Sequence, residues 1–177
     1  MSPKIGYLLP TREQIMEGRP ETGPLIALSE RAETLGYDSI WVGDSLLARP
    51  RHDPLTLLAG VATRTRRVQL GTAVLLPALR NPIVLAQQIA TLDQLSEGRI
   101  ILGVGIGLDL PSVHAEFAAA GVPFEKRVGR PIVRWLDADF ADCLELGRAM
   151  DRCGGCGAGR RTRRGCRVRR DVSDNLH

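Results

Sequence analysis

Four short apolar runs, each followed by a stretch suited to a helix, constrain the fold of this chain more than any other feature. The runs lie at residues 4–9, 39–42, 68–76 and 99–104. Their hydrophobicity is nearly continuous rather than alternating, which is typical of strands covered by helices on both faces. A repeated strand–helix order predicts an α/β protein with a parallel sheet.

Local patterns place helices between these runs. Apolar residues from Leu25 to Leu35 recur at spacings of three and four, which predicts an amphipathic helix with both leucines on its buried face. Asp53-Pro54 and Asn81-Pro82 each put a capping side chain before a proline. This arrangement is typical of the first turn of a helix, so we expect two further helices to begin there.

Two architectures fit four such units: an open doubly wound sheet, or part of a (β/α)₈ barrel. In both, ligands bind beyond the carboxyl ends of the strands. That rule selects four segments in which a site is expected, at residues 10–12, 43–47, 72–77 and 105–110.

The fourth of these segments belongs to a glycine-rich stretch. Gly103, Gly105 and Gly107 alternate there, but Leu108 stands where a dinucleotide-binding motif needs its third glycine. Close packing accounts for Gly103. Gly105 and Gly107 lie past the strand, where no packing demand is expected, so we predict that they let a flat ligand approach the backbone.

Composition excludes several classes of protein. The chain has 177 residues, of which 44% are hydrophobic and 25% charged, as in an ordinary globular domain. Its longest apolar stretch, residues 100–106, is far shorter than the roughly 18 residues of a membrane span. The N-terminus does not resemble a signal peptide, so we expect a cytoplasmic protein without a membrane partner. His52 and His114 are isolated loop histidines, so we predict no metal site.

Several segments resemble the luciferase-like monooxygenase family, the flavin- or deazaflavin-dependent oxidoreductases. The most specific are GYDSIWVGDSL and NPIVLAQQIATLDQLSEGRIILGVGIG, and both VQLGTAVLLPALRNP and HAEFAAAGVPFEKRVGR resemble the same family. The resemblance covers about residues 4–130. It implies a (β/α)₈ barrel that binds FMN or the deazaflavin coenzyme F420 at its C-terminal mouth and reduces or oxygenates a small-molecule substrate.

The resemblance also implies site residues. Family members often carry a bulge with an unusual cis peptide after the third strand, which corresponds to residues 72–75. The loop after the second strand typically supplies an acid followed by a histidine near the reactive ring. Asp44 matches the acid and Ser45 replaces the histidine, so these two are the catalytic candidates. The residues expected to form a flat slot for the ring are Thr72, Ala73, Val74, Gly105 and Gly107.

The pattern changes after residue 130. A (β/α)₈ barrel needs about 250 residues, so residues 1–130 are expected to form its N-terminal half. Residues 131–147 are predicted to form a helix. Residues 148–177 contain nine arginines against three aspartates, with Gly and Cys in abundance, and are expected to form a disordered basic tail. We hypothesise a frameshift or premature end between Arg130 and Arg148.

Three hypotheses about function remain. The leading one is a flavin- or deazaflavin-dependent oxidoreductase of the luciferase-like type. The alternative is a catalytically inactive half-barrel, either a binding or assembly module or a frameshifted product. The third is nucleic-acid binding by the tail, which we do not favour because no aromatic residues interleave its arginines. Open edges on the first and fourth strands predict a homodimer or a partly unfolded chain that binds flavin weakly if at all.

Overall fold

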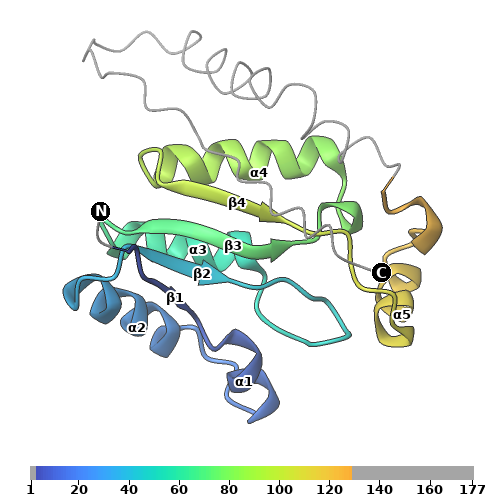
Figure 1. Cartoon of the computed structure of the whole chain (residues 1–177), viewed down its shortest axis with the longest axis horizontal. Coiled ribbons are helices and arrows are strands. Elements are labelled where there is room, and N and C mark those ends of the chain that lie inside the picture. Colours follow the sequence, from blue (N-terminus) through green and yellow to red (C-terminus); the bar gives the residue numbers. More distant parts are fainter. Residues whose placement is uncertain (1–2, 129–177) are drawn as a thin grey trace, which may run out of the picture.

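Residues 3–128 are described by a computed structural model, and their four strands form one parallel sheet (Figure 1). The predicted α/β class is confirmed. The strands are β1 (Gly6–Leu8), β2 (Ser39–Val42), β3 (Gln69–Leu75) and β4 (Ile100–Val104). The predicted helix at 131–147 and the predicted tail at 148–177 lie outside the described residues.

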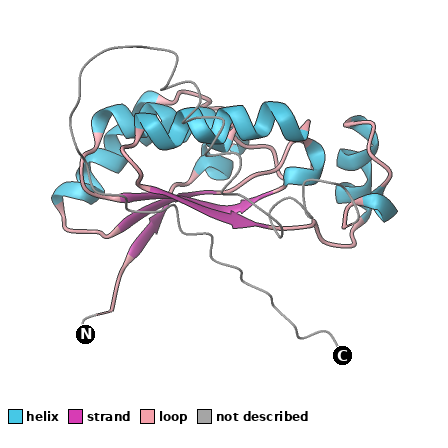
Figure 2. Cartoon of the chain, turned by 90° about the horizontal axis from the view of Figure 1, so that it is seen from above, coloured by secondary structure: helices cyan, strands magenta, loops and turns pink. Residues whose placement is uncertain are grey.

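The order of the strands distinguishes between the two architectures considered. Each strand pairs with the next one along the chain, in the order β1-β2-β3-β4. A doubly wound sheet instead reverses its order at a switch point and carries helices on both faces. Figure 2 shows the helices on one side of the sheet. The expectation of helices on both faces is therefore wrong for residues 3–128, and their sheet has neither the switch in strand order nor the two helix layers of a doubly wound fold.

Three helices cover the sheet: α2 (Gly23–Thr34), α3 (Pro54–Arg64) and α4 (Pro82–Leu95). Both predicted caps are confirmed. The Asp53 carboxylate accepts a hydrogen bond from the Thr56 N–H at 2.8 Å, and the Asn81 side chain accepts one from the Ile83 N–H at 3.0 Å. None of the helices among residues 3–128 is long and apolar enough to cross a membrane.

The hydrophobic core lies between the sheet and this helix layer. Ile40, Leu70 and Leu102 come from three neighbouring strands and are completely buried. They belong to one cluster with Leu58 and Val61 of α3. Burying such a side chain contributes roughly 1.5–3 kcal/mol, so this layer supplies much of the stability of the fold.

The opposite face of the sheet carries Trp41. Its indole N–H donates to the Ser39 hydroxyl at 2.8 Å. Gly6 and Gly71 lie in the two flanking strands, and a Cβ atom at either position would collide with the indole ring. Glycine at both positions therefore leaves room for the indole ring to lie against the sheet.

Two helices follow strand ends where the sequence predicted none, and one of them contains His114, which was expected in a loop. They are α1 (Thr11–Met16) and α5 (Pro111–Ala119). Short 3₁₀ turns, η1 (Pro77–Leu79) and η2 (Phe124–Lys126), also occur at this end of the sheet. Phe117 of α5 is fully buried in a second small core with Ala78 and Phe124.

One helix boundary also differs from expectation. Leu35 was predicted to lie on the buried face of its helix, but its side chain is 66% exposed. The reason is that Leu35 is the C-terminal cap residue of α2, beyond the last turn that packs against the sheet. Leu25 at the other end of the helix is buried as expected.

Candidate functional site

A cavity of about 820 Å³ lies at the carboxyl ends of β2, β3 and β4. Small-molecule sites typically have volumes of about 300–1,000 Å³. The loops after the three strands and helix α5 contribute its walls. Six of the seven predicted site residues line it, namely Asp44, Ser45, Ala73, Val74, Gly105 and Gly107.

An irregularity in β3 shapes one wall of the cavity. The register between β3 and β4 shifts between Thr72 and Leu75, and the Ala73–Val74 peptide bond is cis. The expected bulge with a cis peptide at residues 72–75 is confirmed. Ala73 and Val74 line the cavity.

Thr72 is the predicted site residue that does not line the cavity. Its side chain is completely buried. The hydroxyl donates to the Gly103 carbonyl at 2.8 Å and accepts from the Gly103 N–H at 3.1 Å. Thr72 therefore joins β3 to β4 next to the bulge. A role in holding a cofactor remains a prediction for this residue.

The glycines after β4 have packing reasons to be glycine. A Cβ atom on Gly103 would collide with the Thr72 carbonyl oxygen, which confirms the packing role expected there. A Cβ on Gly105 would lie 2.6 Å from Val74 Cγ2. Gly107 has a φ of +84°, and its Cβ would lie 3.1 Å from the Phe117 ring. The expectation that packing explains neither Gly105 nor Gly107 is therefore wrong, although both line the cavity.

Asp44 is held tightly by its surroundings. Its side chain is only 2% exposed, and both carboxylate oxygens accept hydrogen bonds from the Arg80 guanidinium. The Leu76 N–H donates to the same carboxylate at 2.9 Å. These bonds join the loop after β2 to the end of β3. The catalytic role expected of Asp44 stays a prediction, and the geometry favours a positioning role.

Arg80 bonds a second carboxylate as well. Its guanidinium lies 3.0 Å from Asp53, the N-cap residue of α3. Burial lowers the pKa of Arg80, but hydrogen bonding and the charges of Asp44 and Asp53 outweigh this effect and raise it above its ordinary value. Arg80 is thus a fixed positive charge that joins the β2–α3 loop, the N-terminus of α3 and the end of β3.

Ser45 and Glu116 form a second buried contact at the cavity. The Ser45 hydroxyl donates to the Glu116 carboxylate at 3.0 Å and accepts from the Arg49 N–H at 2.9 Å. Glu116 lies on α5, is 1% exposed, and also accepts the backbone N–H groups of Leu46 and Leu47. Its carboxylate therefore holds the turn that follows β2 in place.

The two candidate histidines lie apart. The His52 ring is 2.8 Å from the Pro20 carbonyl, and the His114 ring is 2.8 Å from the Asp109 carboxylate. Within residues 3–128 there is no group of three or more side chains suited to holding a metal ion.

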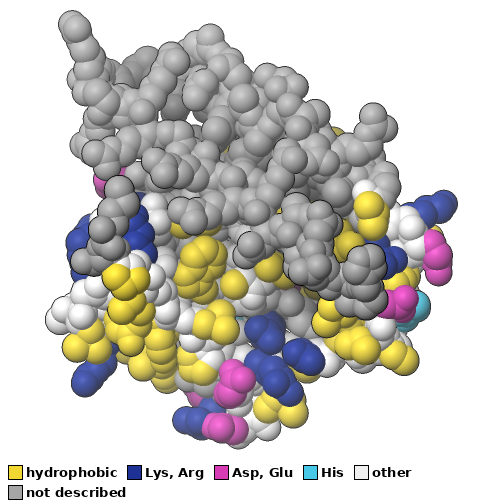
Figure 3. Space-filling view, in the orientation of Figure 1, with side chains coloured by type: hydrophobic (Ala, Val, Ile, Leu, Met, Phe, Trp, Pro, Cys, Tyr) yellow, Lys and Arg dark blue, Asp and Glu magenta, His cyan; other side chains and the backbone are white. Residues whose placement is uncertain are grey.

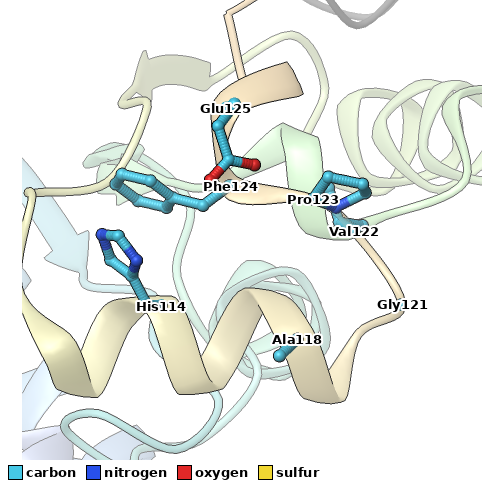
Figure 4. A pocket seen from close by; sticks show the side chains of 7 residues that line it. All are labelled: His114, Ala118, Gly121, Val122, Pro123, Phe124 and Glu125. Atoms are coloured by element: carbon cyan, nitrogen blue, oxygen red, sulfur yellow. The ribbon is translucent and has the colours of Figure 1, made fainter.

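His114 instead borders a smaller cavity of about 390 Å³ between α5 and η2 (Figure 4). Its ring stacks on Phe124 with the ring centroids 3.8 Å apart. The Arg127 guanidinium lies 3.8 Å from the centroid of the same Phe124 ring. These contacts fix the turn after α5.

Comparison with known proteins agrees with this geometry. Residues 3–131 match the luciferase-like monooxygenase family. The chain belongs to this family. Among curated relatives, it is 49% identical over 89 residues to an F420-dependent glucose-6-phosphate dehydrogenase of Amycolatopsis mediterranei (strain U-32), covering 47% of this chain and 27% of the relative.

Two further comparisons extend the match. An F420-dependent glucose-6-phosphate dehydrogenase of Kineococcus radiotolerans is 44% identical over 130 residues, covering 65% of this chain and 37% of the relative. The crystal structure of monooxygenase RslO1 from Streptomyces bottropensis superposes with a TM-score of 0.61 at 28% identity, covering 84% of this chain and 43% of that one. This luciferase-like chain therefore spans about a third of the length of the curated relatives it matches.

Sequence reasoning missed two residues of this luciferase-like site, Arg80 and Glu116. Arg80 lies 36 residues from its partner Asp44, and Glu116 lies 71 residues from Ser45. Neither contact leaves a local pattern in the sequence. The available indication was their position beyond β3 and β4, at the end of the sheet where ligands bind.

Proposed function

We propose that this chain binds coenzyme F420 or FMN in the cavity beyond β2, β3 and β4 and belongs to an oxidoreductase acting on a small organic substrate. The observation that carries the proposal is the cavity itself, with the bulge at Ala73 and Val74 as one of its walls. The names of the curated relatives support F420 in particular.

The lining of the cavity fits a flat ring system. Val74, Val104, Ile106 and Leu110 supply apolar surface, and Gly105 exposes backbone. Such sites combine apolar walls with a few polar groups that fix the orientation of the ligand. When bound, the cofactor supplies the electron or hydride chemistry, and the protein supplies orientation and electrostatics.

The polar residues have distinct proposed roles. Asp44 positions the wall of the cavity through Arg80 and the Leu76 N–H. Ser45 presents a hydroxyl at the cavity, oriented by Glu116, and is the better candidate to touch the cofactor. We retain Ala73, Val74, Gly105 and Gly107 as the proposed cofactor-binding set, and assign Thr72 a supporting role through its hydrogen bonds to Gly103.

We further propose that residues 1–130 are the N-terminal half of a (β/α)₈ barrel. The sequential strand order and the single helix layer support this assignment. In such a barrel the face that carries Trp41 turns toward the interior, where side chains fill the centre.

Cofactor titration tests the proposed function. The full chain is titrated with F420 and, in parallel, with FMN, and binding is followed by fluorescence. We expect saturable binding, tighter for F420. Ala73→Trp, which fills the cavity, should abolish binding, whereas Ala27→Trp on the exposed surface of α2 should not. Failure of the folded chain to bind either cofactor would overturn the proposal.

Turnover separates the enzyme from the alternative. Reduction or oxygenation of a substrate by the cofactor-loaded chain supports an oxidoreductase. Saturable binding without any turnover supports a non-catalytic binding or assembly module instead.

A further inference from the structure

Two arginines that form no ion pair among residues 3–128 line the cavity. Arg49 and Arg51 come from the loop between β2 and α3. Figure 3 shows basic side chains over this loop and beside α1 at its lower centre, with acidic side chains among those beside α1.

The carboxylates of the cavity are already engaged elsewhere. Asp44 accepts hydrogen bonds from Arg80 and from the Leu76 N–H. Glu116 accepts them from Ser45 and the turn that follows it. Neither acid therefore forms an ion pair with Arg49 or Arg51, although both line the same cavity.

Arg51 extends toward the strand ends. A Cβ atom on Gly43, directly after β2, would collide with the Arg51 guanidinium and would lie 3.3 Å from the Ala73 carbonyl oxygen. The guanidinium thus lies against the backbone of Gly43, close to the bulge in β3. Its Nε donates to the Arg49 carbonyl at 3.4 Å, and its Nη groups have no hydrogen-bond partner among residues 3–128.

The surroundings of Arg51 make its positive charge less favourable than it is in water. Burial lowers the pKa of Arg51, and the nearby charges of Arg12 and Arg49 lower it further. Glu13 and Asp44 act in the opposite direction but do not restore the ordinary value. An anion bound between the guanidinium groups would offset this cost.

We propose that Arg49 and Arg51 form an anion site that receives a phosphate or carboxylate group of the substrate. Planar guanidinium groups bind both kinds of oxyanion through paired, charge-assisted hydrogen bonds. The site lies at the same cavity as the proposed cofactor. The inference rests on the proposed function only in assigning the anion to the substrate.

Arginine-specific footprinting of the full chain tests the anion site residue by residue. Phenylglyoxal modifies free arginines, and mass spectrometry reads each position separately, so the arginines at 148–177 do not obscure the result. Inorganic phosphate is the first probe and acetate the second, both at constant ionic strength. Arg31 is the matched control, because it is exposed and also lacks an ion pair among residues 3–128.

We expect phosphate to protect Arg49 and Arg51 saturably and to leave Arg31 unchanged. In Arg51→Ala, the phosphate concentration that half-protects Arg49 should rise about tenfold, the effect of losing one charge-assisted hydrogen-bonding group. If acetate protects the same two arginines, the site accepts carboxylates as well as phosphates. If only phosphate protects them, the site is specific for phosphate groups. Equal protection of all three arginines, or of none, would overturn the anion site.

Repeating the footprint with bound F420 or FMN assigns the anion. Protection by phosphate that persists on the cofactor-loaded chain supports a substrate group. If the cofactor alone protects both arginines and phosphate weakens its binding, the anion belongs to the cofactor and the proposal is wrong. If neither F420 nor FMN binds, the proposed function is wrong. The footprint measured without cofactor still decides whether the anion site exists.

Discussion

Single residues hold the cavity wall in place, and the Asp44–Arg80 pair is the clearest case. The side chains are 2% and 15% exposed, so removing one partner leaves a buried charge unpaired. Arg80→Ala should lower the free energy of unfolding by about 3 kcal/mol, the typical cost of breaking a buried pair. Urea denaturation measures this difference.

The Arg64–Glu30 pair provides a matched control for Arg80. These side chains are 61% and 36% exposed, far more than those of Arg80 and Asp44. Exposed pairs contribute about 0–1 kcal/mol, so Arg64→Ala should have little effect. Equal losses of unfolding free energy in the two variants would show that the buried Asp44 carboxylate does not need Arg80 as its charge partner.

Gly105 is a second residue whose role is specific to its surroundings. An alanine Cβ there would lie 2.6 Å from Val74 Cγ2. Such overpacking typically costs about 1–3 kcal/mol, so Gly105→Ala should lower Tm and weaken cofactor binding. Adding Val74→Ala removes the colliding methyl group and should recover much of the loss.

Gly23→Ala is the control for Gly105, because a Cβ at Gly23 has no atom within 4 Å. This substitution should leave Tm nearly unchanged. A normal Tm for Gly105→Ala alone would contradict the packing role. It would favour the contact with a ligand that was expected from the sequence.

At the scale of elements, Glu33 joins helix α2 to the segment before β3, and this contact makes the stability of the fold depend on pH. Its carboxylate, in the last turn of α2, accepts backbone N–H bonds from Arg66, Arg67 and Val68, which precede β3. Burial raises the pKa of Glu33, but the bonds from Val68, Arg67 and Arg66 and the charge of Arg99 outweigh it and lower the pKa.

A lowered pKa in the folded state fixes the sign of the effect. The stabilisation by Glu33 is present above the unfolded-state pKa of about 4.3 and is lost as the pH falls through the folded-state value. The stability difference between the wild type and Glu33→Gln should therefore shrink between about pH 6 and pH 3. Denaturation at several pH values measures it. Glu21→Gln is the control, because Glu21 is exposed, and it should keep the pH dependence of the wild type. A stability difference between Glu33→Gln and the wild type that does not change with pH would contradict the prediction.

Helices with a side-chain cap, or with the regular apolar spacing of α2, were predictable from the sequence. Asp53 and Asn81 cap α3 and α4 with their own side chains, so the pattern and the structure coincide. Helix α5 follows Leu110, whose side chain forms no capping bond, and this helix was not foreseen. The same holds for the site residues. Asp44 and Ser45 were predicted from their place after a strand, whereas their partners Arg80 and Glu116, far away in the sequence, were not.

At the scale of the whole molecule, β1 is an edge strand of the sheet. Within residues 3–128 it pairs with β2 alone. Edge strands present free backbone donors and acceptors that favour pairing with another chain. Leu8 in β1 is also 55% exposed, which adds apolar surface to that edge. We therefore expect the chain to form homodimers.

Light scattering after size-exclusion chromatography measures this association. The mass should approach that of a dimer as the concentration rises. Leu8→Lys should shift the equilibrium toward the monomer, because a charged side chain on an edge strand opposes pairing. Leu35→Lys is the control: Leu35 is 66% exposed but lies at the end of α2 in the helix layer, so its replacement should leave association unchanged. A monomer at every concentration would contradict the prediction, and equal effects of both lysines would place the interface elsewhere than β1.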